Sequence, residues 1–365
     1  MKFSAPRETI LKPLQAVIGV VERRQTMPIL ANVLLQVGDG RLRITATDLE
    51  VELVAGVDLE VEQEGEITVP GRKLLEICRA LPEGATVKVE LAGDRLTVRS
   101  GRSRFTLSTL PAADFPLVES VGAAERIRLA QAAMRRLVER THFSMAQQDV
   151  RYYLNGMLLE TRDGLLRAVA TDGHRLAMCE TALADGSGPD RQVIVPRKGV
   201  LELQRLLDGD SEMEVAIGRS HVQVDLGDIR FTSKLIDGRF PEYSRVIPGE
   251  TDNIVKADRE LLRRALQRTA ILSNEKYRGI RLTLSEGLLT IQAHNPEQEE
   301  AEEQVEVEYG GDALEIGFNV TYLLDALGVI DEDSVEVGLV DANSSCLIRA
   351  PESDDSRFVV MPMRL

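Results

Sequence analysis

The chain carries the same arrangement of segments three times, and this repetition constrains its fold more than any other feature. Each copy opens with an amphipathic helix pattern, in residues 8–22, 129–143 and 257–271. In the third copy Leu262, Ala265 and Leu266 recur at helical spacing. A repeat of roughly 120 residues is long enough for a whole domain, so each copy is expected to fold around its own core rather than as a solenoid unit.

A hairpin pattern follows each of these helices. Residues 31–50, 155–175 and 279–298 each hold an alternating apolar run, a glycine-containing turn and a second run. The turns Asp39-Gly40, Asp163-Gly164 and Glu286-Gly287 occupy equivalent places. Thr47-Asp48 and Thr171-Asp172 also correspond, and Asn295 stands where a third Asp would be.

The second half of each copy begins with a short strand pattern, a break and another amphipathic helix, in residues 67–82, 193–208 and 314–329. Further alternating strands end each copy. The sequence therefore predicts an α+β fold of three similar domains, each with two helices and antiparallel sheets. We expect the domains to cover residues 1–124, 125–252 and 253–365.

Composition narrows the class of protein. The net charge of −15 and the pI of about 4.9 argue against a chain that wraps nucleic acid over its whole surface. Three dispersed cysteines, Cys78, Cys179 and Cys346, suit a reducing compartment and lack metal-site spacing. We expect neither a signal peptide nor a membrane span, and hence a cytoplasmic protein without a cofactor.

Six helices in one chain suggest a ring. Helices pack about 10 Å apart, so six on a circle span roughly 19 Å at their axes, which leaves too narrow a hole for a DNA duplex about 20 Å wide. Twelve helices span about 38 Å and leave a hole of about 30 Å. A closed dimer therefore accommodates duplex DNA, and a monomer does not.

Charge placement fits this interpretation. Five of the six helix segments carry basic residues, and the segment 320–328 carries none. Acidic residues gather instead in residues 57–66, 296–310 and 330–338. A basic lining inside an acidic shell suits weak, sequence-independent phosphate contact. The alternative is that these are ordinary solvated helix faces.

Several separated segments carry a specific resemblance. Residues 100–116, 143–157, 170–177, 193–200, 231–243, 270–279, 295–303 and 359–365 resemble those of the bacterial DNA polymerase III beta subunits, the processivity clamps. The resemblance covers the whole chain. It implies a head-to-tail dimeric ring of six domains, loaded onto DNA by an ATP-driven clamp loader, that tethers the replicative polymerase and has no catalytic activity.

The resemblance implies a seam between the two subunits. An alternating strand supplies arginines on one face and apolar side chains on the other, and it meets the third domain of the second subunit. The distant positions of the two patches suit a heterologous contact. The expected seam residues are Lys73, Arg102, Arg104, Phe105, Leu107, Ile271, Leu272, Glu297, Glu299, Glu300 and Glu303. Taken alone, the glutamate run is typical of solvated surface.

The resemblance also implies a cleft for a short peptide motif shared by polymerases, the clamp loader and repair proteins, including translesion polymerases. Its apolar character suits Leu and Phe anchors. The expected lining is Leu154, Thr171, Gly173, His174, Arg175, Leu176, Pro241, Arg245, Val246, Tyr322, Val359, Met361, Pro362 and Met363. The C-terminal members also suit a strand packed on its own core.

A third surface is expected to touch DNA. The resemblance suggests Arg24, Arg72, Arg79, Gln148, Tyr152, Tyr153, Lys198 and Arg205. The alternative for the adjacent tyrosines is the start of a buried strand.

Two other classes of function stay open on the residues alone. Asp172 and His174 have the composition of a general-base pair or metal ligands. Against catalysis, His142, His221 and His294 show no metal spacing with His174, and the chain has no nucleophile elbow or phosphate-binding loop. The second alternative is a ring or scaffold that does not bind DNA.

Overall fold

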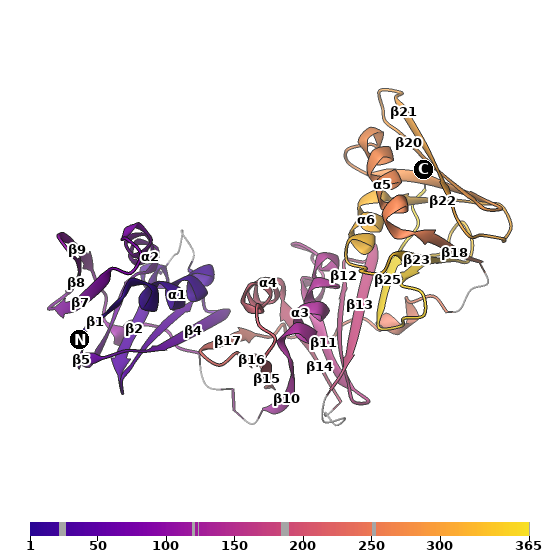
Figure 1. Cartoon of the computed structure of the whole chain (residues 1–365). Coiled ribbons are helices and arrows are strands. Elements are labelled where there is room, and N and C mark those ends of the chain that lie inside the picture. Colours follow the sequence, from indigo (N-terminus) through magenta and orange to yellow (C-terminus); the bar gives the residue numbers. More distant parts are fainter. Residues whose placement is uncertain (22–26, 119–120, 123, 184–189, 250–252, 365) are drawn as a thin grey trace. The chain divides into compact units, whose positions relative to one another are not determined.

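The computed structural model describes residues 1–21, 27–118, 121–122, 124–183, 190–249 and 253–364. The chain forms two compact units, which Figure 1 colours along the sequence. Unit 1 comprises Met1–Ala132 and Leu201–Leu235, and unit 2 comprises Ala133–Val200 and Ile236–Leu365. The second repeat is therefore divided between the two units.

Unit 1 contains two antiparallel sheets. The first runs in the order β5 (Val61–Gln63), β1 (Lys2–Pro6), β7 (Thr86–Ala92), β8 (Arg95–Ser100) and β9 (Ser103–Ser108). The second runs in the order β10 (Glu125–Ala130), β15 (Glu212–Ile217), β16 (His221–Asp225), β17 (Ile229–Lys234), β4 (Val51–Asp58), β3 (Arg41–Thr47), β2 (Asn32–Gly38) and β6 (Gly65–Pro70).

Unit 2 repeats this plan. Its eight-stranded sheet runs in the order β14 (Arg191–Pro196), β11 (Gly156–Arg162), β12 (Leu165–Thr171), β13 (Arg175–Ala182), β25 (Ser356–Val360), β24 (Cys346–Arg349), β23 (Ser334–Leu339) and β18 (Asn253–Asp258). A four-stranded sheet runs in the order β21 (Glu300–Glu306), β20 (Leu288–His294), β19 (Gly279–Ser285) and β22 (Leu314–Asn319).

Each eight-stranded sheet joins two consecutive repeats. In unit 1, β17 of the second repeat pairs with β4 of the first, with Phe231 opposite Leu53. In unit 2, β25 of the third repeat pairs with β13 of the second, with Val359 opposite Leu176. The predicted α+β class with antiparallel sheets is confirmed. The exact boundaries at 124 and 252 stay a prediction, because the contacts divide the chain elsewhere.

The hairpin turns follow from their sequences. Asp39 and Gly40 have φ of 52° and 70°, and Asp163 and Gly164 have φ of 53° and 75°. Two successive positive φ angles twist the turn in the sense that antiparallel strands require, and Asp-Gly adopts them at low cost. These turns fix the registers of β2 on β3 and of β11 on β12.

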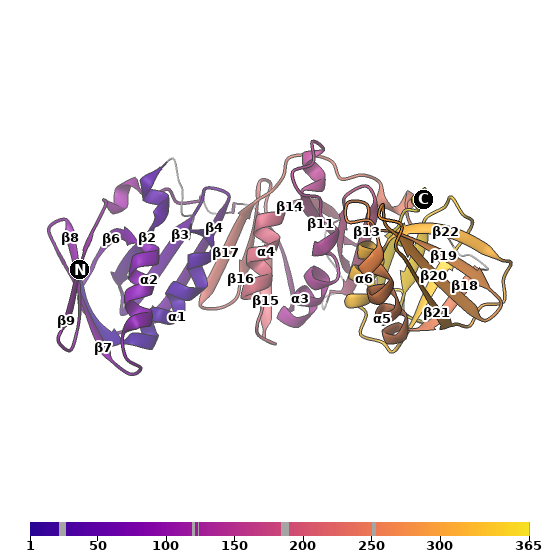
Figure 2. The ribbon, with the colours of Figure 1, turned by 90° about the horizontal axis from the view of Figure 1, so that it is seen from above.

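The predicted helices are present, in shorter form. They are α1 (Arg7–Val17), α2 (Gly71–Ala80), α3 (Gln131–Glu139), α4 (Arg197–Leu206), α5 (Arg259–Thr269) and α6 (Val320–Gly328). Asp258 caps α5 by accepting a hydrogen bond from the Leu261 amide at 2.8 Å, and Asn319 caps α6 in the same way. α1 packs beside α2, and α5 packs beside α6 (Figure 2).

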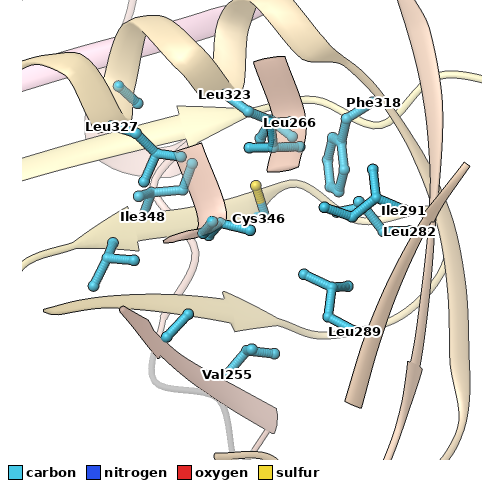
Figure 3. Close-up of a cluster of buried hydrophobic side chains, with 14 of the residues drawn as sticks. Val255, Leu266, Leu282, Leu289, Ile291, Phe318, Leu323, Leu327, Cys346 and Ile348 are labelled. Carbon is cyan, nitrogen blue, oxygen red and sulfur yellow. The ribbon is translucent and has the colours of Figure 1, made fainter. Parts of the chain in front are cut away.

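The third repeat illustrates why the helices lie on the sheets. Leu266 of α5 and Leu323 and Leu327 of α6 point into a cluster with Phe318 and Ile348 (Figure 3). These side chains are almost completely buried. Removing such a side chain from water contributes about 1.5–3 kcal/mol, so the apolar stripe of each helix holds it against the strands.

Candidate functional site

An apolar pocket of about 170 Å³ lies in unit 2 beside the turn between β12 and β13. Both strands belong to the second repeat, and Val359 and Met361 of the third repeat complete the wall. The lining residues are Arg151, Tyr153, Leu154, Thr171, Gly173, Arg175, Leu176, Pro241, Tyr243, Val246, Val359 and Met361. A concave, mostly apolar surface of this kind accepts apolar side chains of a ligand.

Side-chain hydrogen bonds shape the turn at the pocket mouth. The Asp172 carboxylate accepts from the amides of His174 and Arg175 at 2.9 and 3.1 Å, and the Thr171 hydroxyl accepts from the Gly173 amide at 3.1 Å. Gly173 has φ of 89°, a conformation that other residues rarely adopt. The turn therefore keeps a fixed shape without help from a ligand.

The same turn occurs in the first repeat, where no pocket residue is expected. Asp48 accepts from the amides of Glu50 and Val51 at 2.9 and 2.7 Å, and Thr47 accepts from the Leu49 amide at 3.1 Å. The Asp172 carboxylate is thus a turn-forming group, already bound to two amides and to the Arg175 guanidinium. This arrangement argues against the general-base alternative for Asp172 and His174.

The structure brings most of the expected cleft residues to this pocket. Those in the lining are Leu154, Thr171, Gly173, Arg175, Leu176, Pro241, Val246, Val359 and Met361. The remaining five lie outside the lining. His174 is exposed and its carbonyl accepts from the Met361 amide at 2.9 Å, and Arg245 is exposed and pairs with Glu242. Met363 donates its amide to the Gly317 carbonyl, and Pro362 lies between these two anchored methionines.

Tyr322 lies on α6 against Arg175 rather than in the lining. Three lining residues were missed as cleft residues: Arg151, Tyr153 and Tyr243. Arg151-Tyr152-Tyr153 carries the composition of a nucleic-acid contact, which masked the role of Tyr153 as a pocket wall. Arg151 also binds Asp149, and its side-chain and backbone hydrogen bonds lower the pKa of Asp149 to about 2.

The residues that were expected to contact DNA differ in how far they are exposed to solvent. Arg24 lies outside the described residues. Arg79, Gln148 and Tyr152 are exposed, while Arg72, Tyr153 and Lys198 are half-buried. Arg72 donates to the Val21 carbonyl at 2.5 Å.

Arg205 is exposed, yet its guanidinium is engaged at the end of a helix. It donates to the Gln15 and Ala16 carbonyls in the last turn of α1, and it pairs with Glu202 at 3.0 Å. The last carbonyls of a helix commonly need partners from outside it, so Arg205 also acts as a helix cap.

The sequence predicts basic side chains that project from the helices into solvent, and the structure shows this for only some of them. Arg140 is 5% exposed and binds Ser356 and Asp331 at 2.9 and 2.8 Å. Arg136 pairs with Asp355. Arg140 reaches the buried Ser356 hydroxyl, and charge-assisted bonds to the exposed Asp331 and the partly exposed Asp355 hold the two guanidinium groups. Arg264, in contrast, keeps its guanidinium largely exposed beside Glu260.

The expected seam residues lie on two edge strands and their flanks. β9 is the edge of the five-stranded sheet, with Arg104 exposed and Leu107 facing the core. Arg102 lies in the turn that precedes β9, and Lys73 is exposed on α2. β21 is the edge of the four-stranded sheet and carries Glu300 and Glu303.

The glutamates of this edge differ in environment. Glu300 is exposed, Glu297 lies in the turn before β21, and Glu299 accepts a hydrogen bond from Asn295. Glu303 turns toward α5 and pairs with Arg268 at 2.6 Å, which lowers the pKa of Glu303. Ile271 is 75% exposed and Leu272 is half-buried. Ile271 therefore presents an apolar side chain to solvent beside β21, the edge strand of its sheet.

Among the described residues, no group of three or more His, Cys, Asp or Glu side chains has the arrangement of a metal site. None of the described helices is long and apolar enough to cross a membrane.

Three family models match almost the whole chain. They are the N-terminal domain of the DNA polymerase III beta subunit over residues 1–119, its central domain over 128–242 and its C-terminal domain over 244–364. The chain is 59% identical to the beta sliding clamp of Pseudomonas aeruginosa and 55% identical to that of Escherichia coli K12, over the full length of each.

Solved structures agree with these matches. The crystal structure of the Pseudomonas aeruginosa DNA polymerase III subunit beta matches with a TM-score of 0.97 at 58% identity, and it covers both chains completely. The Caulobacter crescentus beta sliding clamp matches with a TM-score of 0.96 at 40% identity, over 100% of this chain and 99% of the other. By full-length sequence identity and by fold, the chain belongs to the DNA polymerase III beta subunit family, the beta sliding clamps.

Proposed function

We propose that two copies of this chain close head to tail into a ring around duplex DNA, with the helices lining the hole, and that the ring tethers the replicative polymerase during synthesis. Membership of the family makes the chain a replication processivity factor and an accessory subunit of DNA polymerase III without catalytic activity of its own. Family membership does not by itself establish the closed ring, the contact between its two subunits or the residues that touch DNA and partner proteins, and these are what we propose.

The order of the strands is the observation that carries the ring. Within the chain, β4 of the first repeat pairs with β17 of the second, and β13 of the second pairs with β25 of the third. β17 and β25 are the last strands of their repeats, and β9 is the last strand of the first repeat. β21 corresponds to β4 and β13, because each is the third strand after the first helix of its repeat.

By this correspondence, β21 lacks the partner strand that β4 and β13 have, and β9 lacks the partner strand that β17 and β25 have. The pairing of β21 with β9 of a second copy would repeat the joint that the chain already makes twice. It would also join the four-stranded sheet of β22, β19, β20 and β21 to the five-stranded sheet of β9, β8, β7, β1 and β5 as one continuous sheet. Two such joints close a dimer, and they cover edges that would otherwise promote aggregation.

The side chains on the two edges are complementary. β9 offers the half-buried Phe105 on one face, beside Leu107, which already faces the core, and the exposed Arg104 on the other. Beside β21, Ile271 offers an apolar surface, while Glu300 and Glu302 face solvent. Pairing would cover Phe105 and Ile271 and place the arginine near the carboxylates, which would set the register and the direction of the contact.

The pocket in unit 2 is proposed as the tether. It accepts Leu and Phe side chains of a short peptide motif from the polymerase, and the same motif on the clamp loader, translesion polymerases and repair proteins competes for it. A related structure, the Pseudomonas aeruginosa clamp bound to griselimycin, supports the view that clamps of this kind bind organic ligands. The exposed Arg79 and Tyr152 are proposed to touch DNA without reading its sequence, in the cytoplasm.

A topological experiment tests the ring. The protein is loaded with a clamp loader and ATP onto nicked circular DNA, half of the sample is linearised, and both halves are sized by gel filtration at raised salt. Protein held by encirclement stays on the circles and is lost from the linear ends. Protein held by surface charge leaves both DNA forms equally as salt rises, and this result would overturn the ring.

A further inference from the structure

The segment 236–249, which we call the strap, leads from β17 toward the third repeat and packs on one face of the eight-stranded sheet of unit 2. Its Phe240 is buried against Leu158, Val169 and Met178, which lie side by side on β11, β12 and β13. The Ile236 amide donates to the Ile194 carbonyl at 2.9 Å. The strap therefore rests on an apolar row that crosses the sheet.

A polar row lies two residues farther along the same strands. Glu160 stands opposite Gln192 on one side and Arg167 on the other, and Arg167 stands opposite Glu180. Glu160 is only 4% exposed, and it accepts hydrogen bonds from Gln192 and from the Tyr243 hydroxyl of the strap. Arg167 binds Glu180 at 2.6 Å and Glu160 at 3.5 Å.

Tyr243 stands between two hollows of different character. One is the apolar pocket of about 170 Å³. The other is a polar groove of about 600 Å³, lined by Glu160, Arg167 and Gln192 among others. Pro241 and Tyr243 line both. The wall between pocket and groove therefore includes a side chain whose hydroxyl is tied to the sheet by hydrogen bonds to Glu160 and Arg167.

We propose that Tyr243 determines which apolar side chains the pocket accepts, and that Glu160 is the positioning residue that holds the Tyr243 ring in place. The proposal rests on the function proposed above for the pocket. Without the Glu160 acceptor, only the bond to Arg167 holds the hydroxyl, and the ring has open space on its groove side, so it can swing away and enlarge the pocket. With the acceptor, the wall is fixed before the ligand arrives, which lowers the entropic cost of binding.

The electrostatics support this assignment. Burial, together with the hydrogen bond to the Glu160 carboxylate, raises the pKa of Tyr243 to about 12. Burial alone would raise the pKa of Glu160, but the bonds from Tyr243 and Gln192 and the charge of Arg167 outweigh it and lower that pKa. Across the physiological range the phenol therefore stays a donor and the carboxylate stays an acceptor.

The experiment uses the full-length protein and two fluorescein-labelled octapeptides. One carries adjacent Leu and Phe side chains, and the other carries naphthylalanine in place of Phe. The variants are Tyr243→Phe, Tyr243→Ala, Glu160→Met and Glu160→Gln. Tyr309→Phe is the matched control, because the Tyr309 hydroxyl also donates a hydrogen bond, to the Asp312 carbonyl at 2.7 Å, away from the pocket.

We expect Tyr243→Phe and Glu160→Met to weaken binding of the peptide that contains Phe about fivefold, which is the loss typical of one hydrogen bond. Glu160→Gln keeps an acceptor and should restore affinity to within about twofold of the wild type. Tyr243→Ala should shift the preference at least about tenfold toward the naphthyl peptide, because its pocket is wider. A purely structural role would weaken both peptides equally and leave their ratio unchanged.

Two results together would overturn the inference: Tyr243→Phe binds the peptides as tightly as Tyr309→Phe does, and Tyr243→Ala leaves the ratio of the two peptide affinities unchanged. The proposed role of the pocket as the tether would then still stand. A wild-type protein that binds neither peptide overturns the inference and the proposed pocket together. Melting temperatures of all variants identify any that fail to fold, and in that case Tyr243→Phe, which removes one oxygen atom, decides the outcome.

Discussion

The Arg175 guanidinium carbon lies 4.5 Å from the centre of the Tyr322 ring, so a cation of the second repeat stacks on an aromatic ring of the third. The same guanidinium binds Asp172 at 3.2 Å, pairs with Asp325 of α6 and donates to the Phe143 carbonyl at 2.7 Å. One side chain therefore ties the turn at the pocket mouth to α6.

We predict that Arg175→Lys weakens binding of a Leu-Phe peptide about tenfold and lowers the stability of unit 2 by roughly 1–3 kcal/mol. A lysine keeps the charge but cannot form the planar stack and the separate hydrogen bonds at once. Fluorescence anisotropy and urea unfolding measure the two effects. Arg264→Lys, on the exposed face of α5, is the control. Equal behaviour of the two variants would contradict the role of Arg175.

The seam makes a second prediction. Ile271→Ala combined with Leu272→Ala should shift the dimer toward monomer, because two buried apolar contacts worth about 2–4 kcal/mol together are lost at the interface. Mass photometry at nanomolar concentration gives the distribution. Leu201→Ala, at a 38% exposed position on α4, should leave it unchanged. An unchanged mass for the double variant would defeat the assignment of this surface.

Substitutions of Arg205 and Arg79 distinguish a role in capping a helix from a role in binding DNA. Arg205→Ala removes the bonds to the Gln15 and Ala16 carbonyls and should lower the stability of unit 1 by about 1 kcal/mol. Arg79→Ala should leave stability within about 0.5 kcal/mol and weaken DNA binding uniformly across sequences. Urea unfolding and salt-dependent DNA titration provide the readouts. If Arg205→Ala reduces DNA affinity at unchanged stability, the helix cap is not its main role.

Glu160 makes the stability of the fold depend on pH. Its folded pKa lies below the ordinary value of 4.5, so its contribution to stability is present above that value and is lost as the pH falls through the folded pKa. Glu160→Gln should therefore cost about 1–2 kcal/mol at neutral pH and progressively less below pH of about 4. Urea midpoints at several pH values measure this convergence. A cost independent of pH would show that the carboxylate charge contributes nothing, and Glu66→Gln, an exposed site, is the control.

The three cysteines should be unreactive in the native protein. Burial raises the pKa of Cys78 to about 11 and that of Cys346 to about 12, and it also raises the pKa of Cys179. Because the thiolate is the reactive form, Ellman's reagent at pH 8 should label all three only after denaturation. Rapid labelling of any one of them in the folded protein would show that its segment opens locally.

The threefold repeat, the hairpins and the helix stripes were readable from the chain because each depends on neighbouring residues. Asp39-Gly40 and Asp163-Gly164 predict their turns, and the spacing of Leu262 and Leu266 predicts the buried side of α5. The family follows from the same local patterns, since its specific phrases are contiguous. Most of the pocket lining was also predicted, but through resemblance rather than from local physics.

The pairing of groups far apart in the chain needed the tertiary structure. Glu303 was expected at the seam, and whether it faces a second copy or Arg268 depends on where α5 lies against β21. Arg140 looks like any solvated helix arginine until Ser356 and Asp331 are placed beside it. Tyr243 lines the pocket where the strap packs on the sheet, and its hydroxyl bonds to Glu160, which lies 83 positions earlier in the chain.

By itself, the sequence determined the local structure and the number of repeats, because backbone preference and apolar spacing act over a few residues. The tertiary structure decided which strands join successive repeats, which edges stay unpaired and which charges are already neutralised. Those outcomes depend on hydrogen bonds and ion pairs between residues dozens to hundreds of positions apart, and their strength is set by burial, which no local pattern records.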